Sequence, residues 1–329
     1  MRWTGKNVVV TGAGGFIGSH LCEALLEAGA QVTAIIHYNS QNNWGNLELL
    51  SPQHRAALNA VAGNIEDSDF VNRQVKNQHV VFHLAALIGI PYSYIAPRSY
   101  IRTNIEGTMN VLEAGRNFDL ERIVHTSTSE TYGTAIYTPI DENHPLQGQS
   151  PYSASKIGAD KMAESYYLSF GLPVSTIRPF NTYGPRQSAR AVIPSIISQA
   201  LTQNQIRLGS LDPVRDLTYV KDTVRGFINV AESEQTIGKV TNVGFGKGIT
   251  IGELAKTILS LMESDKPLVL DSRRVRPSKS EVFKLICDNT QARERTGWQP
   301  QYSLEAGLKE VITFVSNNPT LFKSEQYAV

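Results

Sequence analysis

A glycine-rich turn between a short apolar strand and a helix constrains the fold of this chain more than any other feature of its sequence. Residues 7–10 have the pattern of a buried strand, and a helix with one apolar face is expected from about 16 to 28. Between them, Gly12 permits a tight turn, Gly15 lets the backbone approach a pyrophosphate, and Gly18 lets the helix pack close to the strand. Free N–H groups at a helix N-terminus favour phosphate. The turn therefore predicts a dinucleotide site.

The first half of the chain alternates short apolar runs with helical patterns. Further strands are expected at 31–36, 58–62, 80–84, 122–126 and 174–177, and long helices at 97–114 and 151–170. Such alternation predicts an α/β fold with a Rossmann-type, doubly wound parallel sheet covered on both faces. After Pro179 the loops lengthen, although a helix at 222–231 and a strand at 240–243 still fit the sheet.

This change of rhythm predicts two unequal domains. The dinucleotide-binding domain is expected to span 1–180 plus about 216–245. A smaller α/β C-terminal lobe, formed by 181–215 and 246–329, is expected to bind the substrate.

The end of the second strand lacks the acidic residue that would bind the ribose of NAD and repel the extra phosphate of NADP. His37, Asn39 and Ser40 lie there instead and could hold that phosphate, so the prediction leans toward NADP and leaves NAD open. A surface-loop histidine is the alternative for His37. The other residues of the predicted cofactor site are Phe16 and Ile17 in the turn, Asn64 and Ile65 after the third strand, and Leu84, Ala85 and Ala86 after the fourth.

Tyr152 and Lys156 lie four residues apart and so share one face of the helix expected at 151–170. A tyrosine alone titrates at about pH 10, but a nearby ammonium and a cationic nicotinamide ring both favour the phenolate. Tyr152 is therefore a candidate general base near neutral pH. Thr128 follows the fifth strand, at the sheet edge where ligands bind, and is expected to hydrogen-bond the reacting oxygen.

The chain resembles the extended short-chain dehydrogenase/reductases of the nucleotide-sugar epimerase/dehydratase family. The matching motifs are Thr11–Gly18, His83–Ala86, Thr103–Thr108, Thr128–Gly133, Tyr152–Lys156, Arg178–Arg186, Arg215-Asp216, Arg276-Pro277 and Ser280–Val282. This resemblance implies that Asn104 belongs to the cofactor site, together with Tyr152 and Lys156. It also implies a tightly bound cofactor that is regenerated, and oxidation of a sugar hydroxyl at C4.

Glu130 distinguishes the reactions within this family. The resemblance implies a small residue at this position in most 4-epimerases and a carboxylate in 4,6-dehydratases. The triplet Thr128-Ser129-Glu130 is similar to that of the GDP-mannose 4,6-dehydratases. After oxidation at C4, a carboxylate can take the acidified C5 proton, water leaves from C6, and hydride returns to C6. Because Ser129 stands where others have Asp, Glu130 is expected to act as both base and acid. The alternatives are a solvated loop carboxylate, or one that orients Tyr132.

The C-terminal lobe is expected to hold the nucleotide diphosphate, because Arg offers bidentate donors to phosphate. The candidates are Asn181, Arg186, Arg215 and Arg276, with a surface salt bridge as the alternative for each arginine. The segments 37–45 and 184–194 resemble dehydratases that act on nucleotide-linked N-acetylglucosamine, UDP or GDP, on the way to legionaminic-acid-type or related bacterial surface sugars. A 4-epimerase, a net reductase and a non-catalytic dinucleotide sensor remain as rival functions.

A formal net charge of +1 gives no reason to expect nucleic acid or an anionic membrane as partner. Two cysteines far apart predict neither zinc site nor disulfide framework, and no metal is expected. No signal-peptide pattern or run of about 18 apolar residues is present, so a cytoplasmic protein is expected. The resemblance implies a homodimer through a four-helix bundle built from helices around 98–115 and 151–170.

Overall fold

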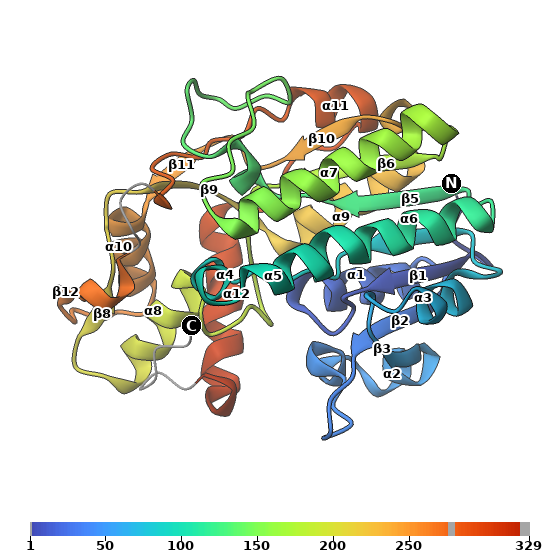
Figure 1. Cartoon of the computed structure of the whole chain (residues 1–329). Helices are drawn as coiled ribbons and strands as arrows, with labels where there is room; N and C mark the ends of the chain where they lie inside the picture. The colour runs from blue at the N-terminus through green and yellow to red at the C-terminus, as the bar shows by residue number, and fades with distance from the viewer. Residues whose placement is uncertain (1, 276–279, 323–329) are drawn as a thin grey trace.

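The computed structural model describes residues 2–275 and 280–322. At its centre is a seven-stranded sheet in the order β10-β6-β5-β4-β1-β2-β3, in which every pairing is parallel (Figure 1). Its strands are β1 (Asn7–Thr11), β2 (Gln31–His37), β3 (Asn59–Gly63), β4 (Val80–His83), β5 (Arg122–Thr126), β6 (Val174–Pro179) and β10 (Val240–Val243). This is the doubly wound parallel sheet expected from the sequence.

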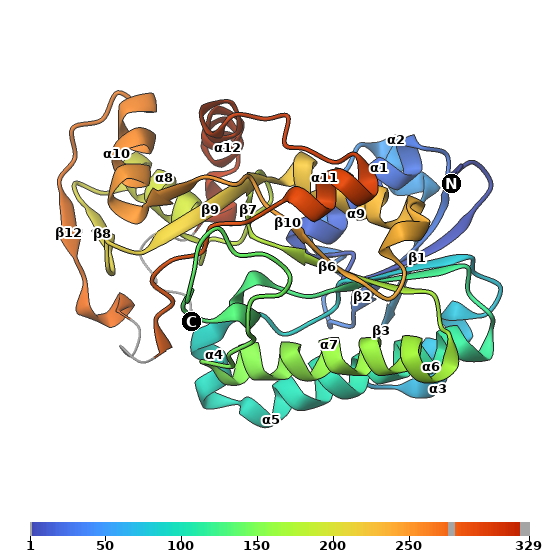
Figure 2. The same ribbon diagram turned by 90° about the horizontal axis from the view of Figure 1, so that it is seen from above.

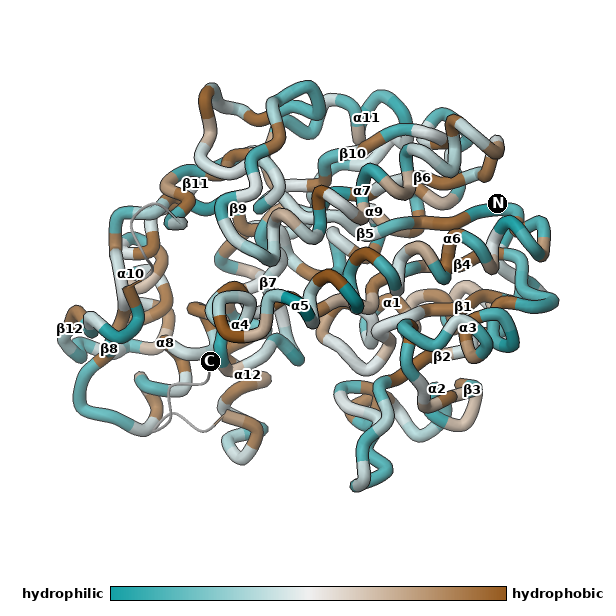
Figure 3. Tube along the Cα trace, in the orientation of Figure 1, coloured by the Kyte–Doolittle hydropathy of each residue, from teal (hydrophilic) through white to brown (hydrophobic). Residues whose placement is uncertain are grey.

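Helices cover both faces of this sheet (Figure 2). One face carries α1 (Phe16–Glu27), α9 (Val220–Glu232) and α11 (Thr290–Thr296), and the other carries α3 (Ser68–Val75), α6 (Gly107–Asn117) and α7 (Pro151–Phe170). Alternate residues of β1 serve the two faces, as strand geometry requires. Val8 and Val10 join the apolar cluster under α1, whereas Val9 joins the cluster under α6 and α7. Figure 3 shows β1 as hydrophobic and the loop after β2 as hydrophilic.

The long helix expected at 97–114 is present as continuous helical backbone from 97 to 117, but its middle is π-helical. The chain forms α5 (Pro97–Tyr100), a π-helical segment η2 (Ile101–Glu106) and then α6. Asn104 lies on this π-helical segment, and its side chain extends from the helix to hydrogen-bond the loop after β4. Its amide accepts from Leu87 N (2.8 Å) and donates to Leu87 O (3.0 Å) and Ser155 Oγ (2.9 Å).

A second, smaller part of the molecule carries two small sheets, β11-β9-β7 and β12-β8. The strands are β7 (Asn181–Tyr183), β8 (Ile206–Leu208), β9 (Val214–Tyr219), β11 (Gly248–Thr250) and β12 (Leu268–Leu270), and the helices are α8 (Val192–Thr202), α10 (Ile251–Leu261) and α12 (Leu304–Asn317). We propose the two-lobe division on this basis. Helix α11, expected in the smaller lobe, packs instead against α9 and β10 of the large sheet.

One apolar cluster continues from the large sheet into the smaller part. It contains Val8 and Val10 of β1, Phe227 of α9, and Leu254 and Ile258 of α10. The remaining short elements are η1 (Gly45–Leu49), α2 (Pro52–Ala57), α4 (Ile90–Ile95), η3 (Ser129–Tyr132), η4 (Glu234–Thr236), η5 (Ser272–Arg274) and η7 (Pro319–Leu321). No helix in the described ranges has the length and apolar character needed to cross a membrane.

Candidate active site

The turn between β1 and α1 has no room for side chains. Gly12 has a φ of +69°, and a Cβ there would lie 2.8 Å from Ala85 N. A Cβ on Gly18 would clash with Gly12 O. Gly15 begins α1 with no side-chain cap, so the first N–H groups of the helix remain for a ligand. The turn therefore fits a dinucleotide pyrophosphate, which needs close backbone approach and helix N–H donors.

A cleft of about 930 Å³ starts at this turn, crosses the carboxyl ends of β4 and β5, and reaches the smaller sheets. Many of the residues predicted from the sequence line it. They are Gly12, Gly15, Phe16, Ile17, Gly18, His37, Asn39, Leu84, Ala85, Ala86, Thr128, Ser129, Glu130, Tyr152, Lys156, Asn181 and Arg215. The sheet thus brings together segments that are far apart in the sequence.

Other predicted residues do not line the cleft. Ser40 is exposed on the loop after β2, and Asn64 accepts a hydrogen bond from Glu66 N in its own turn. Ile65 is buried in the cluster beneath α6. Asn104 lies behind the loop after β4, bonded to Leu87. Arg276 lies outside the described residues.

Arg186 does not lie in the cleft where it was expected to bind phosphate. Its guanidinium pairs with the Glu23 carboxylate of α1 at 2.9 Å, and it does not line the cleft. Its carbonyl accepts from Asn46 Nδ2 at 3.0 Å. Arg186 therefore connects the segment after β7 to α1 and to the loop after β2. The structure gives Arg186 a salt bridge, as in the alternative interpretation of this residue.

The loop between β2 and η1 folds back onto the glycine turn. Asn46 N donates to Gly14 O at 2.9 Å, and a Cβ on Gly14 would lie 2.8 Å from Trp44 O. Asn43 and Trp44 consequently line the cleft, although the sequence reasoning did not select them. A local sequence pattern does not reveal the contact between Trp44 and Gly14, because it depends on how the loop after β2 packs against the glycine turn.

The amide of Asn39 is occupied within this loop. Its Oδ1 accepts from Gln41 N (3.2 Å) and Asn43 N (3.0 Å), and its Nδ2 donates to Asn43 O (2.7 Å). Its donors are therefore directed at the loop itself.

At the far end of the cleft, Arg215 on β9 forms an ion pair of 3.0 Å with Glu281, and both residues line the cavity. Arg190 and Arg274 also line it and were missed. Arg190 lies in the segment 184–194, whose resemblance to nucleotide-sugar dehydratases could have identified it as a candidate substrate-binding residue. Arg190, Arg215 and Arg274 thus bring guanidinium groups to the lining of the cleft, and such groups suit phosphate.

Tyr152 and Lys156 lie on the first turns of α7, which begins with a capping box between Ser150 and Ser153. Both side chains are buried, with 7% and 4% of their surfaces exposed. The Thr128 side chain is close enough to Tyr152 to favour the phenolate, and so it acts to lower the pKa of the phenol. Lys156 Nζ donates to Thr126 O, at the end of β5, at 2.6 Å. The predicted trio of Thr128, Tyr152 and Lys156 is therefore brought together.

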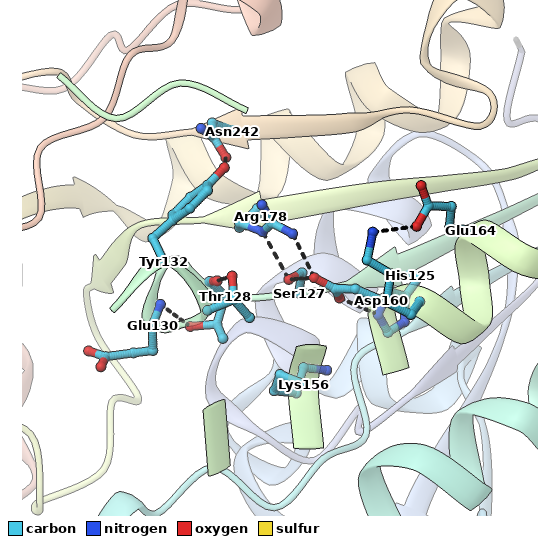
Figure 4. A network of polar contacts seen from close by, with 12 residues as sticks. His125, Ser127, Thr128, Glu130, Tyr132, Lys156, Asp160, Glu164, Arg178 and Asn242 are labelled. Atoms are coloured by element: carbon cyan, nitrogen blue, oxygen red, sulfur yellow. Dashed lines mark hydrogen bonds and ion pairs between the residues drawn. The ribbon is translucent and has the colours of Figure 1, made fainter. Parts of the chain in front are cut away.

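Burial dominates the electrostatics of this pair. It raises the pKa of Tyr152 far above its usual value, and the nearby Glu130 carboxylate adds to that rise. Burial lowers the pKa of Lys156 to about 8. Glu130 lines the cleft from η3, and its carboxylate points away from the polar network of Asp160 (Figure 4). Tyr152 is thus a neutral phenol at rest, and it can act as a base only after it has lost its own proton and a positive charge stabilises the phenolate.

Residues 9–311 match the model of the family described as GDP-mannose 4,6 dehydratase. This chain belongs to that family. A putative UDP-glucose 4-epimerase of Methanocaldococcus jannaschii is 30% identical over 94% of this chain and 99% of the relative. A dTDP-glucose 4,6-dehydratase of Streptomyces griseus is 31% identical over 94% of this chain and 93% of the relative. The family therefore includes both reactions at this level of similarity.

Solved structures show the same breadth. The dTDP-glucose 4,6-dehydratase DesIV of Streptomyces venezuelae, crystallised with NAD and TYD, has a TM-score of 0.87 and 27% identity over 97% of this chain and 100% of its own. A UDP-N-acetylglucosamine 4-epimerase of Methanobrevibacter ruminantium has a TM-score of 0.87 and 31% identity over 96% of this chain and 99% of its own. This chain is an enzyme of the NAD-dependent nucleotide-sugar dehydratase/epimerase family.

Proposed function

We propose that this enzyme is a 4,6-dehydratase that converts UDP- or GDP-N-acetylglucosamine to the 4-keto-6-deoxy sugar. The observation that carries the proposal is the Glu130 carboxylate, which lines the cleft and is close enough to Tyr152 for its charge to raise the pKa of the phenol. A base beside the C4-oxidising tyrosine is what abstraction at C5 requires. An epimerase needs no such base.

In this proposal the residues divide the proton transfers between them. Thr128 orients the C4 hydroxyl, and Tyr152 takes its proton while the Lys156 ammonium stabilises the phenolate. A bound nicotinamide dinucleotide supplies reversible hydride transfer, accepting hydride from C4 and returning it at C6. Glu130 takes the C5 proton and passes a proton to the departing C6 hydroxyl, which leaves as water. When hydride returns at C6, a proton that has exchanged with solvent is delivered to C5. The Ser129 hydroxyl is too weak an acid to protonate the leaving group, so Glu130 performs both roles.

We propose NAD as the cofactor, which reverses the lean toward NADP. Of the three residues considered for a 2′-phosphate, Asn39 directs its amide into its own loop and Ser40 does not line the cleft. His37 lines the cleft, with Nδ1 bonded to Tyr38 O at 2.8 Å. Among the described residues that line the cleft from this loop, none is Arg or Lys. Such a site has few groups that could bind the 2′-phosphate of NADP.

Substrate and assembly follow from the same cleft and its surroundings. Arg190, Arg215 and Arg274 are proposed to bind the nucleotide diphosphate. Helices α6 and α7 lie side by side (Figure 1), and Met109 and Leu168 leave apolar surface on them. We propose that these helices form the four-helix bundle of a homodimer. The place in legionaminic-acid-type sugar synthesis and the cytoplasmic location remain predictions from the sequence.

The test is incubation of the enzyme with UDP- and GDP-N-acetylglucosamine in heavy water. The expected product is lighter by one water and carries deuterium at C5, by mass spectrometry and NMR. Recovery of an isomeric sugar with inverted C4 and no loss of water would overturn the proposal in favour of a 4-epimerase. Glu130→Gln should abolish elimination, whereas Glu27→Gln, which changes an exposed carboxylate at the end of α1, should not.

A further inference from the structure

A buried polar network of Asp160, His125, Ser127 and Arg178 lies beside Lys156 (Figure 4), and of these four residues only Ser127 lines the cleft. At its centre is Asp160, one helical turn beyond Lys156 on α7. Its carboxylate accepts hydrogen bonds from Ser127 Oγ (2.6 Å) and His125 Nε2 (3.0 Å), and pairs with the Arg178 guanidinium at 2.7 Å. The proposed reaction assigns no role to Asp160, His125 or Arg178.

Arg178 and the hydrogen bonds hold this carboxylate in its charged form. Burial opposes ionisation of Asp160, but the Arg178 guanidinium and the bond from His125 keep the pKa of Asp160 well below its usual value. Arg178 Nε also donates to Ser127 Oγ at 3.1 Å, and its guanidinium lies 4.6 Å from the centre of the Tyr132 ring. The carboxylate is therefore fixed in both charge and position.

The ionisable groups around Lys156 come from several elements. Tyr152 and Asp160 share its helix, His125 comes from β5, His83 from β4, and Glu130 lies on η3 beyond Tyr152. Burial lowers the pKa of both histidines, so both are neutral.

Asp160 is the neighbour whose charge favours the ammonium. Burial lowers the pKa of Lys156, and the Asp160 carboxylate is what raises it. Lys156 Nζ donates a hydrogen bond to the neutral carbonyl of Thr126, which supplies no charge. Within the network Lys156 and Arg178 are cations and Asp160 is the anion, so removal of Asp160 would leave two buried positive charges without a counter-charge.

We propose that Asp160 is a positioning residue: its buried carboxylate keeps Lys156 an ammonium, and Arg178, His125 and Ser127 hold that carboxylate in place. The inference deepens the proposed function, because the Lys156 ammonium is what makes Tyr152 a usable base. The titration of Lys156 is nevertheless a property of the protein without substrate, and it can be measured as such.

The experiment follows the Cε resonance of Lys156 against pH in protein labelled with ¹³Cε-lysine, assigned from its loss in Lys156→Arg. In the unmodified protein the midpoint should lie at about pH 8. In Asp160→Asn the proton affinity of Lys156 should fall by about tenfold or more, which is one pH unit or more in the midpoint. A midpoint that does not move in the folded variant overturns the proposal.

Asp160→Asn leaves Arg178 buried without its partner, so a second variant guards against loss of folding. Asp160→Asn/Arg178→Met removes both charges at similar volume, and its midpoint should still lie below that of the unmodified protein. A midpoint restored to that of the unmodified protein would mean that Asp160 acts only by balancing Arg178, which also overturns the proposal. Ser127→Ala keeps the Asp160 charge and removes one hydrogen bond. It should shift the midpoint far less than Asp160→Asn, and an equal shift would contradict a role for the charge.

Kinetics connect this property to catalysis. With an active substrate, the alkaline limb of kcat/KM should move to lower pH in Asp160→Asn, whereas the affinity for the dinucleotide, measured by calorimetry, should change little. A purely structural Asp160 would lower kcat at all pH values without moving that limb. If the Lys156 midpoint falls as expected but no nucleotide sugar loses water, the proposed function fails and the inference about Asp160 stands.

Discussion

Lys156 Nζ donates a 2.6 Å hydrogen bond to the backbone carbonyl of Thr126, the last residue of β5. This bond fixes the ammonium at the carboxyl edge of the sheet, next to the turn that carries Thr128. Tyr152 lies one turn earlier on the same helix and lines the cleft together with Thr128 and Lys156. The predictions below depend on this arrangement and on the charges around it.

Turnover should decline at alkaline pH. Burial lowers the pKa of Lys156 to about 8, so the ammonium that stabilises the Tyr152 phenolate is lost as the pH rises through that value. A profile of kcat/KM for the cofactor-loaded enzyme from pH 6 to about 10 should show an alkaline limb near 8. Lys156→Met should lose activity at every pH. A profile that stays flat to pH 10 would contradict the role of Lys156.

Glu130→Gln should separate oxidation from elimination. The variant retains Thr128, Tyr152 and Lys156, so hydride transfer from C4 should still occur, but the C5 proton has no acceptor. We expect product formation to fall by about 100-fold or more, the usual effect of removing a general base. Absorbance at 340 nm should reveal reduced cofactor that accumulates with substrate. Unchanged release of water would assign the base to another residue.

Arg186→Met should affect stability more than substrate binding, because its guanidinium pairs with Glu23 and does not line the cleft. We expect a loss of about 1 kcal/mol in the free energy of unfolding, typical of a partly exposed pair. Arg215→Met is the matched comparison, since Arg215 lines the cleft, and it should raise KM for the nucleotide sugar. Melting temperature and KM, measured on both variants, distinguish an effect on stability from an effect on substrate binding. A large rise in KM with an unchanged melting temperature in Arg186→Met would return this residue to the substrate site.

Asp216 should make part of the stability depend on pH. This buried carboxylate accepts from three backbone N–H groups, at Phe245, Gly246 and Cys287, and burial raises its pKa to about 6. A raised pKa means that the folded state binds the proton more tightly. Its contribution is therefore full below the unfolded pKa of about 4 and is lost as the pH rises through 6, by at most about 3 kcal/mol.

Denaturant unfolding of the unmodified protein and of Asp216→Asn at pH 5 and 7.5 tests this. The variant should be less stable at both, since its amide places a donor among N–H donors, at a cost of about 1–3 kcal/mol. The gap between the two proteins should narrow toward pH 7.5, because only the unmodified protein loses the Asp216 contribution. A gap that widens with pH would show that the three N–H donors outweigh burial.

Local patterns predicted most of the large sheet and the centre of the site. Gly15 and Gly18 are required by contacts within one strand–turn–helix unit, and Gly12 by its positive φ and by the loop after β4. Tyr152 and Lys156 are paired by helical spacing. The misses depend on contacts between distant segments. Each of three contacts needs a partner from another element. Arg186 pairs with Glu23, Trp44 O lies against Gly14, and Asn104 hydrogen-bonds Leu87 from a π-helical turn. Asp160 stood at helical spacing from Lys156, but only β5 and β6 reveal its partners.

The apolar cluster shared by β1, α9 and α10 limits which parts of such an enzyme can be removed or exchanged. The two lobes differ in topology, yet they share one interior, so they should melt in a single cooperative transition. A fragment that ends after β6 would expose the side of the cluster that α9 and α10 complete. Exchange of the substrate lobe with that of a relative must therefore carry the matching interior residues along with the surface that binds the sugar.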